Sequence, residues 1–198
     1  MCRISVMVVM AGMFLSASIS AEDLIVDLGP DEKIVVTRHD RDIKIDGILD
    51  EAIWQQLPAY DEFVVTEPDT MVKPPYRTRV KIFYTDKGLY VGINMDQPQD
   101  TLIARLSGRD NRELNRDSIN LTLDTSGEGR YGFWFGVNLG GSLMDGTLLP
   151  ERQFSSDWDG AWRAETHRTD NGWSAEFLIP WGTVSMPKVV ETRRIGFY

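Results

Sequence analysis

Residues 43–54 read Ile-Lys-Ile-Asp-Gly-Ile-Leu-Asp-Glu-Ala-Ile-Trp, and this stretch decides the fold. Its start alternates like a short strand that ends in an Asp-Gly turn. The acidic pair Asp50-Glu51 follows, where negative charge suits a helix N-terminus. Helical spacing then places three apolar side chains on one face, those of Leu49, Ile53 and Trp54. The stretch predicts a short helical cap over residues 49–57 that closes one end of a β-sandwich.

The remainder of the chain alternates with a period of two, as half-buried strands do. Asp86-Lys87-Gly88 and Asn171-Gly172 are strong turn signals between such segments. Many short strands with regular turns predict an all-β fold, an antiparallel two-sheet sandwich. The predicted strands are 79–84, 89–95, 117–124, 131–138, 161–168 and 172–179.

The N-terminus has the pattern of a secretory signal. Arg3 precedes an apolar run, residues 4–15, which is too short to span a bilayer. Small residues lead to a predicted cleavage after Ala21, so residues 1–21 are interpreted as a signal peptide. The alternative is a retained membrane anchor. We expect an exported protein, either periplasmic, outer-membrane-associated or extracellular, that has lost its single cysteine, Cys2, with the signal.

The net charge of the chain limits which partners it can bind, and its length limits how many domains it can contain. The chain carries a formal net charge of −9, which argues against nucleic acid and suits a neutral ligand or a cation such as calcium. Residues 22–41 are predicted to be a lead-in segment and residues 42–187 one sandwich domain. Residues 188–198 resemble the beginning of a strand, so we expect them to start a following segment of a longer protein. The alternative is a terminal strand that simply ends.

Several motifs follow one another in a characteristic order along the chain. They are Ile45-Asp46-Gly47 with Trp54, Arg109-Asp110, Asp117, Leu123-Asp124-Thr125, Tyr131-x-Phe133, Val137-Asn138, Trp158-Asp159-x-x-Trp162 and Asn171-Gly172-Trp173-x-x-Glu176-x-x-Ile179-Pro180-Trp181. Together they resemble the carbohydrate-binding module of family 9, in the variant that opens a family of bacterial envelope proteins of uncharacterised activity. The resemblance covers residues 42–181 and implies a lectin-like, jelly-roll type sandwich, followed in the whole protein by a large β-rich region.

Strand alternation predicts a binding face on residues 131–138. Phe133, Phe135 and Val137 share the apolar face with Tyr131, whereas Trp134 and Asn138 share the other face with two glycines. A tryptophan between glycines forms a flat shelf on which the C–H face of a sugar can stack, and Asn138 offers a donor and an acceptor. The alternative is that Trp134 lies beneath another element. Three residues of neighbouring strands are expected on the same polar face: Tyr90, Asn94 and Asn120.

The long connection from Gly140 to Gly160 is a second candidate region, because long loops are often functional. Trp158 is predicted to close over a ligand opposite Trp134, whereas Trp162 is interpreted as framework. The resemblance places Arg109 beside the ligand face; the alternative is an ion pair between Arg109 and Asp117. Three carboxylates are weak candidates for a structural calcium site: Asp145, Asp157 and Asp159.

These observations favour a carbohydrate-binding module of a secreted or envelope protein, with glycan as its partner and a role in polysaccharide catabolism. The alternative is a structural sandwich that packs on a C-terminal β-rich region without binding sugar. Catalysis has little support, because the sequence contains no nucleophile-elbow motif and no zinc-ligand spacing. Any glycoside hydrolysis would reside in the full-length protein.

Overall fold

The computed structural model describes residues 24–29, 32–66, 68, 70–186 and 193–198. The predicted signal peptide lies outside the described residues. The strands are β1 (Leu24–Gly29), β2 (Glu32–Arg38), β3 (Thr78–Tyr84), β4 (Gly88–Asp96), β5 (Ser118–Asp124), β6 (Gly132–Asn138), β7 (Leu143–Leu149), β8 (Gln153–Ser155), β9 (Arg163–Thr169), β10 (Gly172–Pro180) and β11 (Arg193–Phe197). One short α-helix, α1, spans Ala52–Gln56, and two 3₁₀ turns span Gln99–Thr101 and Pro150–Arg152.

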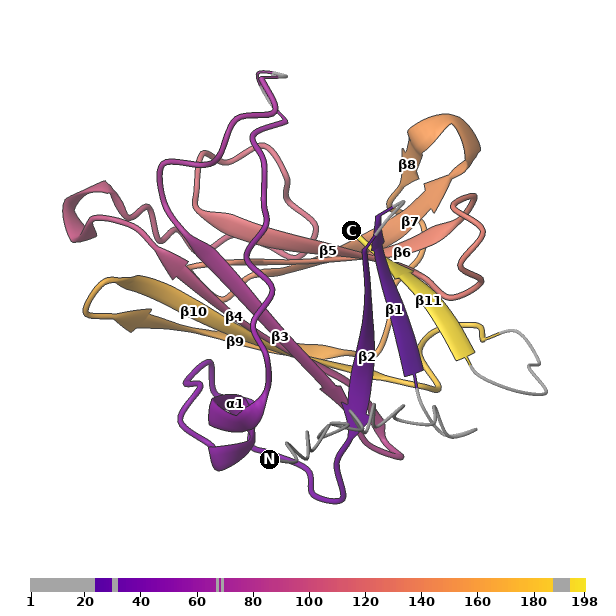
Figure 1. Cartoon of the computed structure of the whole chain (residues 1–198). Helices are drawn as coiled ribbons and strands as arrows, with labels where there is room; N and C mark the ends of the chain where they lie inside the picture. Colours follow the sequence, from indigo (N-terminus) through magenta and orange to yellow (C-terminus); the bar gives the residue numbers. More distant parts are fainter. Residues whose placement is uncertain (1–23, 30–31, 67, 69, 187–192) are drawn as a thin grey trace, which may run out of the picture.

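The strands form two layers that face each other (Figure 1). Sheet A has the order β8-β7-β6-β5-β11-β1-β2, and sheet B has the order β3-β4-β10-β9. Strand β2 links the layers, because it pairs with β1 in one and, through two residue pairs, with β3 in the other. The predicted all-β two-sheet sandwich is confirmed, as is the helical cap, which is shorter than predicted. Residues 43–45, predicted as a strand, are not in a strand.

The turn signals act as the sequence indicated. Tyr84 pairs with Leu89 across the Asp86-Lys87-Gly88 turn, so β3 and β4 form a hairpin. Thr169 pairs with Gly172 across the Asn171 turn, so β9 and β10 form another. Alternation then sends one set of side chains from each sheet into a common core. Phe135, Val137, Phe177 and Ile179 are among its fully buried members.

Two segments outside the predicted domain core are part of sheet A. The predicted lead-in contains β1 and β2. Strand β11, which falls within residues 188–198, lies between β1 and β5. Its Ile195 is fully buried in the core between the sheets. The structure therefore includes both segments in the sandwich.

Helix α1 covers the outer face of sheet B and makes a second, smaller core there. Ile53 and Trp54 of the helix are buried against Phe83, Tyr90 and Leu178 of the sheet. The Phe83 and Tyr90 rings stack at 4.6 Å, and the Trp54 ring meets Phe83 edge-on at 5.0 Å. Within the part of the chain that the structure describes, no helix has the length and apolar character needed to span a bilayer.

Candidate functional site

The outer face of sheet A carries two of the residues that were predicted to bind, Trp134 and Asn120. In the register of the sheet, Asn120 of β5 lies opposite Gly136 and Thr122 lies opposite Trp134. Trp134 in turn lies opposite Gly146 of β7. Because cross-strand partners share a face, Trp134 and Asn120 lie together on the outer side of the sheet, as the alternation predicts.

Glycines allow two aromatic rings to lie directly on this face. A Cβ atom at Gly136 would stand 2.9 Å from the Trp134 ring and 2.6 Å from Asn120 Oδ1. A Cβ atom at Gly146 would stand 2.6 Å from the ring of Phe154 in β8. The Trp134 and Phe154 rings meet edge-to-face, with centroids 5.3 Å apart. We call these two half-buried rings the aromatic shelf.

The shelf is not fully open, in contrast to the prediction. The guanidinium carbon of Arg112 lies 3.9 Å from the Phe154 ring centroid and 5.3 Å from that of Trp134. Neither Phe154 nor Arg112 was predicted, because both reach Trp134 from segments distant in the sequence. No local pattern marks such a contact.

Asn138 does not extend the shelf, so this part of the prediction is wrong. Its side chain is 0% exposed, and Oδ1 accepts a hydrogen bond of 3.0 Å from the backbone N–H of Ser142. The reason is a tight turn after β6, which is closed by a second bond from Asn138 N–H to the Ser142 carbonyl at 3.1 Å. The side chain folds back to hold the turn and is unavailable to a ligand in this conformation.

Tyr90 and Asn94 were also misplaced. Both are in β4, which pairs with β3 and β10 in sheet B rather than with the strands beside β6. Tyr90 is 0% exposed beneath α1. Asn94 is half-buried in sheet B. Alternation gives the face of a side chain within one strand, but it does not give the neighbouring strand.

Trp158 lies on the opposite side of sheet A from Trp134, so it cannot close over a ligand on the aromatic shelf. Its ring packs on the inward-facing Phe133 at 4.9 Å and Phe135 at 5.7 Å. Trp162, interpreted as framework, is 5% exposed and stacks on Phe177 at 5.8 Å.

Arg109, predicted to lie beside the ligand face, joins an ion-pair cluster, and its partners differ from the alternative of a pair with Asp117. Its Nη2 atom lies 2.9 Å from both the buried Asp145 and the exposed Asp159. Asp145 also accepts hydrogen bonds from Gly160 N–H at 2.7 Å and from Trp162 Nε1–H at 3.2 Å. The cluster therefore fastens the 140–160 connection to the core.

These contacts occupy the carboxylates that were predicted to coordinate a calcium ion. The Arg109 guanidinium already lies between Asp145 and Asp159, and Asp157 accepts a hydrogen bond from Ser155 Oγ at 3.1 Å. Among the described residues, no group of three or more His, Cys, Asp or Glu side chains could hold a metal ion. The three candidate carboxylates thus do not fit calcium as they stand.

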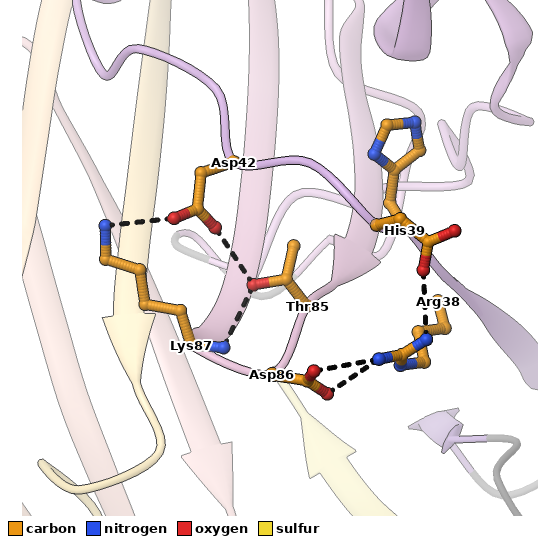
Figure 2. Close-up of a pocket in the computed structure, with 7 residues that line it drawn as sticks. Arg38, His39, Asp42, Thr85, Asp86 and Lys87 are labelled. Carbon is orange, nitrogen blue, oxygen red and sulfur yellow. Dashed lines mark hydrogen bonds and ion pairs between the residues drawn. The ribbon is translucent and has the colours of Figure 1, made fainter.

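A polar hollow of about 390 Å³ lies where β2 meets β3 (Figure 2). Its charged groups pair with one another: Arg38 with Asp86 at 2.9 Å and with Asp40 at 3.0 Å. Asp42 accepts a hydrogen bond of 2.7 Å from the Tyr90 hydroxyl, which is the largest cause of its lowered pKa. This internal pairing joins β2 and the loop after it to the hairpin of β3 and β4.

Glu176 fixes the turn and the helix of residues 43–54 on sheet B. Its side chain is 0% exposed, and Oε2 accepts hydrogen bonds of 2.9 Å from the N–H groups of Asp46 and Gly47. Oε1 accepts a third, also of 2.9 Å, from Trp54 Nε1–H. Burial raises the Glu176 pKa from 4.5 to about 7, although these hydrogen bonds oppose the rise. Gly47 is required in the turn, since its φ is +82° and a Cβ would stand 2.6 Å from the Thr166 backbone.

Comparison of the structure with solved structures identifies the class of fold. Neither a protein-family model nor a curated protein matches the chain. The structure is similar to a family 9 carbohydrate-binding module from Caldicellulosiruptor kristjanssonii in complex with cellotriose, with a TM-score of 0.55 and 14% identity over 82% of this chain and 72% of that one. It is also similar to the module from the same organism in complex with glucose, with a TM-score of 0.53 and 15% identity over 82% and 73% of the chains. The chain therefore has a fold like that of carbohydrate-binding module family 9.

Proposed function

We propose that this domain binds glycan on the aromatic shelf of sheet A. The observation that carries the proposal is the seating of Trp134 and Phe154 on glycines, with Asn120 beside them, on the outer face of the sheet. An indole ring offers the C–H face of a pyranose a flat apolar surface, and Asn120 offers both a donor and an acceptor to hydroxyl groups. The solved modules of similar fold, which are in complex with cellotriose and glucose, support a sugar as the ligand.

The expected affinity is modest. Each hydrogen bond formed in exchange for water contributes only about 1 kcal/mol. One stacked ring and a few such bonds correspond to a dissociation constant on the order of micromolar to millimolar. Binding of this strength suits a module that keeps a protein near an abundant polysaccharide, so we propose polysaccharide catabolism as the setting.

Titration calorimetry with a panel of plant, algal and bacterial polysaccharides tests the proposal. Trp134→Ala is expected to abolish measurable binding while the domain remains folded. Tyr76→Ala, which removes an exposed aromatic ring from the loop between α1 and β3, is the matched control and should bind like wild type. If no polysaccharide binds, or if Trp134→Ala binds as well as wild type, the proposal fails.

Asn120→Ala tests the polar partner separately. Loss of one hydrogen bond of about 1 kcal/mol should weaken binding roughly fivefold. Asn94→Ala is its control, because Asn94 lies in sheet B. If Asn120→Ala and Asn94→Ala change the affinity for glycan equally, Asn120 does not contact the ligand.

A module that packs on another part of its protein is the second candidate. The loop between α1 and β3 favours it, because Val64, Met71, Val72 and Tyr76 are exposed there. Export, which this proposal shares with the first, is supported by the N-terminal sequence pattern alone. Absence of glycan binding together with normal folding would favour this second function.

A further inference from the structure

We propose that the aromatic shelf selects acidic glycans, with Arg112 binding the carboxylate of a uronic acid residue. This inference rests on the proposed glycan binding and names the class of sugar. It departs from the neutral ligand that the net charge of the chain suggests, because local charge rather than net charge decides what a single site binds.

Arg112 is held in a conformation suited to a carboxylate. Its guanidinium lies over the Phe154 ring, 3.9 Å from the centroid, and also near Trp134. An arginine that stacks through its flat face keeps its N–H edges free, and those edges form a fork that matches a carboxylate. The side chain is exposed, and it forms no ion pair with any residue that the structure describes. The fork is thus oriented in advance and open to a ligand.

A second arginine lies at the other end of the shelf. Arg116 Nη2 lies 2.7 Å from the sulfur of Met144, whose methyl group would be 3.2 Å from a Cβ atom at Gly136. The hydrogen bonds of Arg116 go to the carbonyls of Asn111 and Leu114, so its charge is not neutralised by a carboxylate of the described chain. Arg112 and Arg116 therefore both add positive charge beside Trp134.

The described residues that surround Trp134 on the outer face of β5 to β8 carry no acidic side chain. The register of β5 to β8 places the following residues on the outer face: Asn120, Thr122, Trp134, Met144, Leu148 and Phe154. By contrast, Arg79 pairs with Asp96 and Arg109 pairs with Asp145. A local excess of positive charge in a chain of net charge −9 is what an anionic ligand would select.

The carboxylate of a uronic acid fits better than a sulfate ester because of its shape. It is planar and attached directly to the sugar ring, so a ring that stacks on Trp134 can place both oxygens against one guanidinium fork. A sulfate ester is tetrahedral and projects from the ring through an additional oxygen atom. Sulfated glycans accordingly form a separate arm of the test.

The experiment compares each acidic oligosaccharide with its own neutral counterpart. Oligomers of galacturonate, alginate and glucuronate, and the same oligomers after reduction of their carboxyl groups, are titrated into the mature domain by calorimetry. We expect at least one uronate to bind about tenfold or more tightly than its reduced form, since hydrogen bonds to charged groups are the strong ones. Arg112→Met, which keeps the apolar packing, should abolish that preference. Arg112→Lys, which keeps the charge but not the fork, should retain only part of it.

The controls separate this inference from the proposed function. Arg163→Met removes an exposed arginine from β9 in sheet B and should leave the preference unchanged. If wild type binds a neutral oligomer as tightly as its uronate, the inference fails while glycan binding stands. If sulfated glycans bind more tightly than uronates, or if Arg112→Met keeps the preference, the assignment of Arg112 to a carboxylate is overturned. If no glycan of any kind binds, both proposals fail.

Discussion

The buried carboxyl group of Glu176 should make this fold lose stability as the pH rises through neutrality. Its three hydrogen-bond donors are neutral N–H groups, two from the Asp46-Gly47 turn and one from the Trp54 indole. No cation contacts it among the described residues, and the negative charge of Glu51 is a further, smaller cause of its raised pKa. The charged form is therefore buried without a counter-charge.

The magnitude follows from the two pKa values. A Glu176 pKa of about 7 in the folded protein and 4.5 in the unfolded chain means that the folded state binds the proton more tightly. The stabilisation that the protonated Glu176 carboxyl provides is complete below pH 4.5, and it is lost as the pH rises through 7. At about 1.36 kcal/mol per pH unit, the loss is about 3 kcal/mol. The unfolding free energy of a typical domain is only about 5–15 kcal/mol, so this loss is a large part of it.

Urea unfolding of wild type and Glu176→Gln between pH 4.5 and 8.5 isolates this contribution. Glutamine does not titrate, so the difference in unfolding free energy between the two proteins should change by about 3 kcal/mol over that range. The glutamine amide also leaves one of the three N–H donors without an acceptor, but this cost is the same at every pH. Glu165→Gln is the control, because Glu165 is the exposed cross-strand partner of Glu176. If the difference in unfolding free energy between wild type and Glu176→Gln stays constant between pH 4.5 and 8.5, the reasoning is refuted.

The remaining predictions concern stability and processing. Trp54→Ala should lower the unfolding free energy by about 3–5 kcal/mol in urea titrations, because the ring is 1% exposed. Trp162→Ala should also lower the unfolding free energy in urea titrations, because the ring is 5% exposed and stacks on Phe177. Asp145→Asn should cost about 1.5–3 kcal/mol, as expected for hydrogen bonds to a charged group, whereas Asp157→Ala should change stability by less than about 0.5 kcal/mol. Expression of the full chain in a Gram-negative host should yield a protein that begins near Glu22 by mass spectrometry, and recovery of only the uncleaved chain in membranes would contradict the signal-peptide prediction.

The period-two segments predicted six strands well because each was bounded by a local turn signal. Strands β7 and β8 were missed, and their residues were predicted to belong to a long loop. In β7 the sequence Met144-Asp145-Gly146 argues against a strand, since aspartate and glycine are both disfavoured there. The structure tolerates them for reasons that are distant in sequence: Arg109 pairs with Asp145, and Phe154 occupies the space that a side chain at residue 146 would need.

The errors in the candidate site have a related cause. Alternation assigned Trp134 and Asn120 to one face, but it could not show that β4 belongs to the other sheet, so Tyr90 was misplaced. The pairing of strands is decided by the whole sandwich. Arg112 was missed for the same reason, because its aromatic partners lie on β6 and β8 while it lies in the loop before β5.

The residues that carry the family resemblance and the residues proposed to bind sugar are largely different sets. Of the motif residues, Glu176 and Trp54 hold the Asp46-Gly47 turn on sheet B, and the Trp162 indole donates a hydrogen bond to Asp145 of the 140–160 connection. These contacts hold buried parts of the sandwich together and do not involve the aromatic shelf. Arg112 is exposed and Phe154 is half-buried, and both lie outside the motifs. Similarity at 14% identity therefore shows the fold, and the proposed choice of sugar depends on side chains that the motifs do not include.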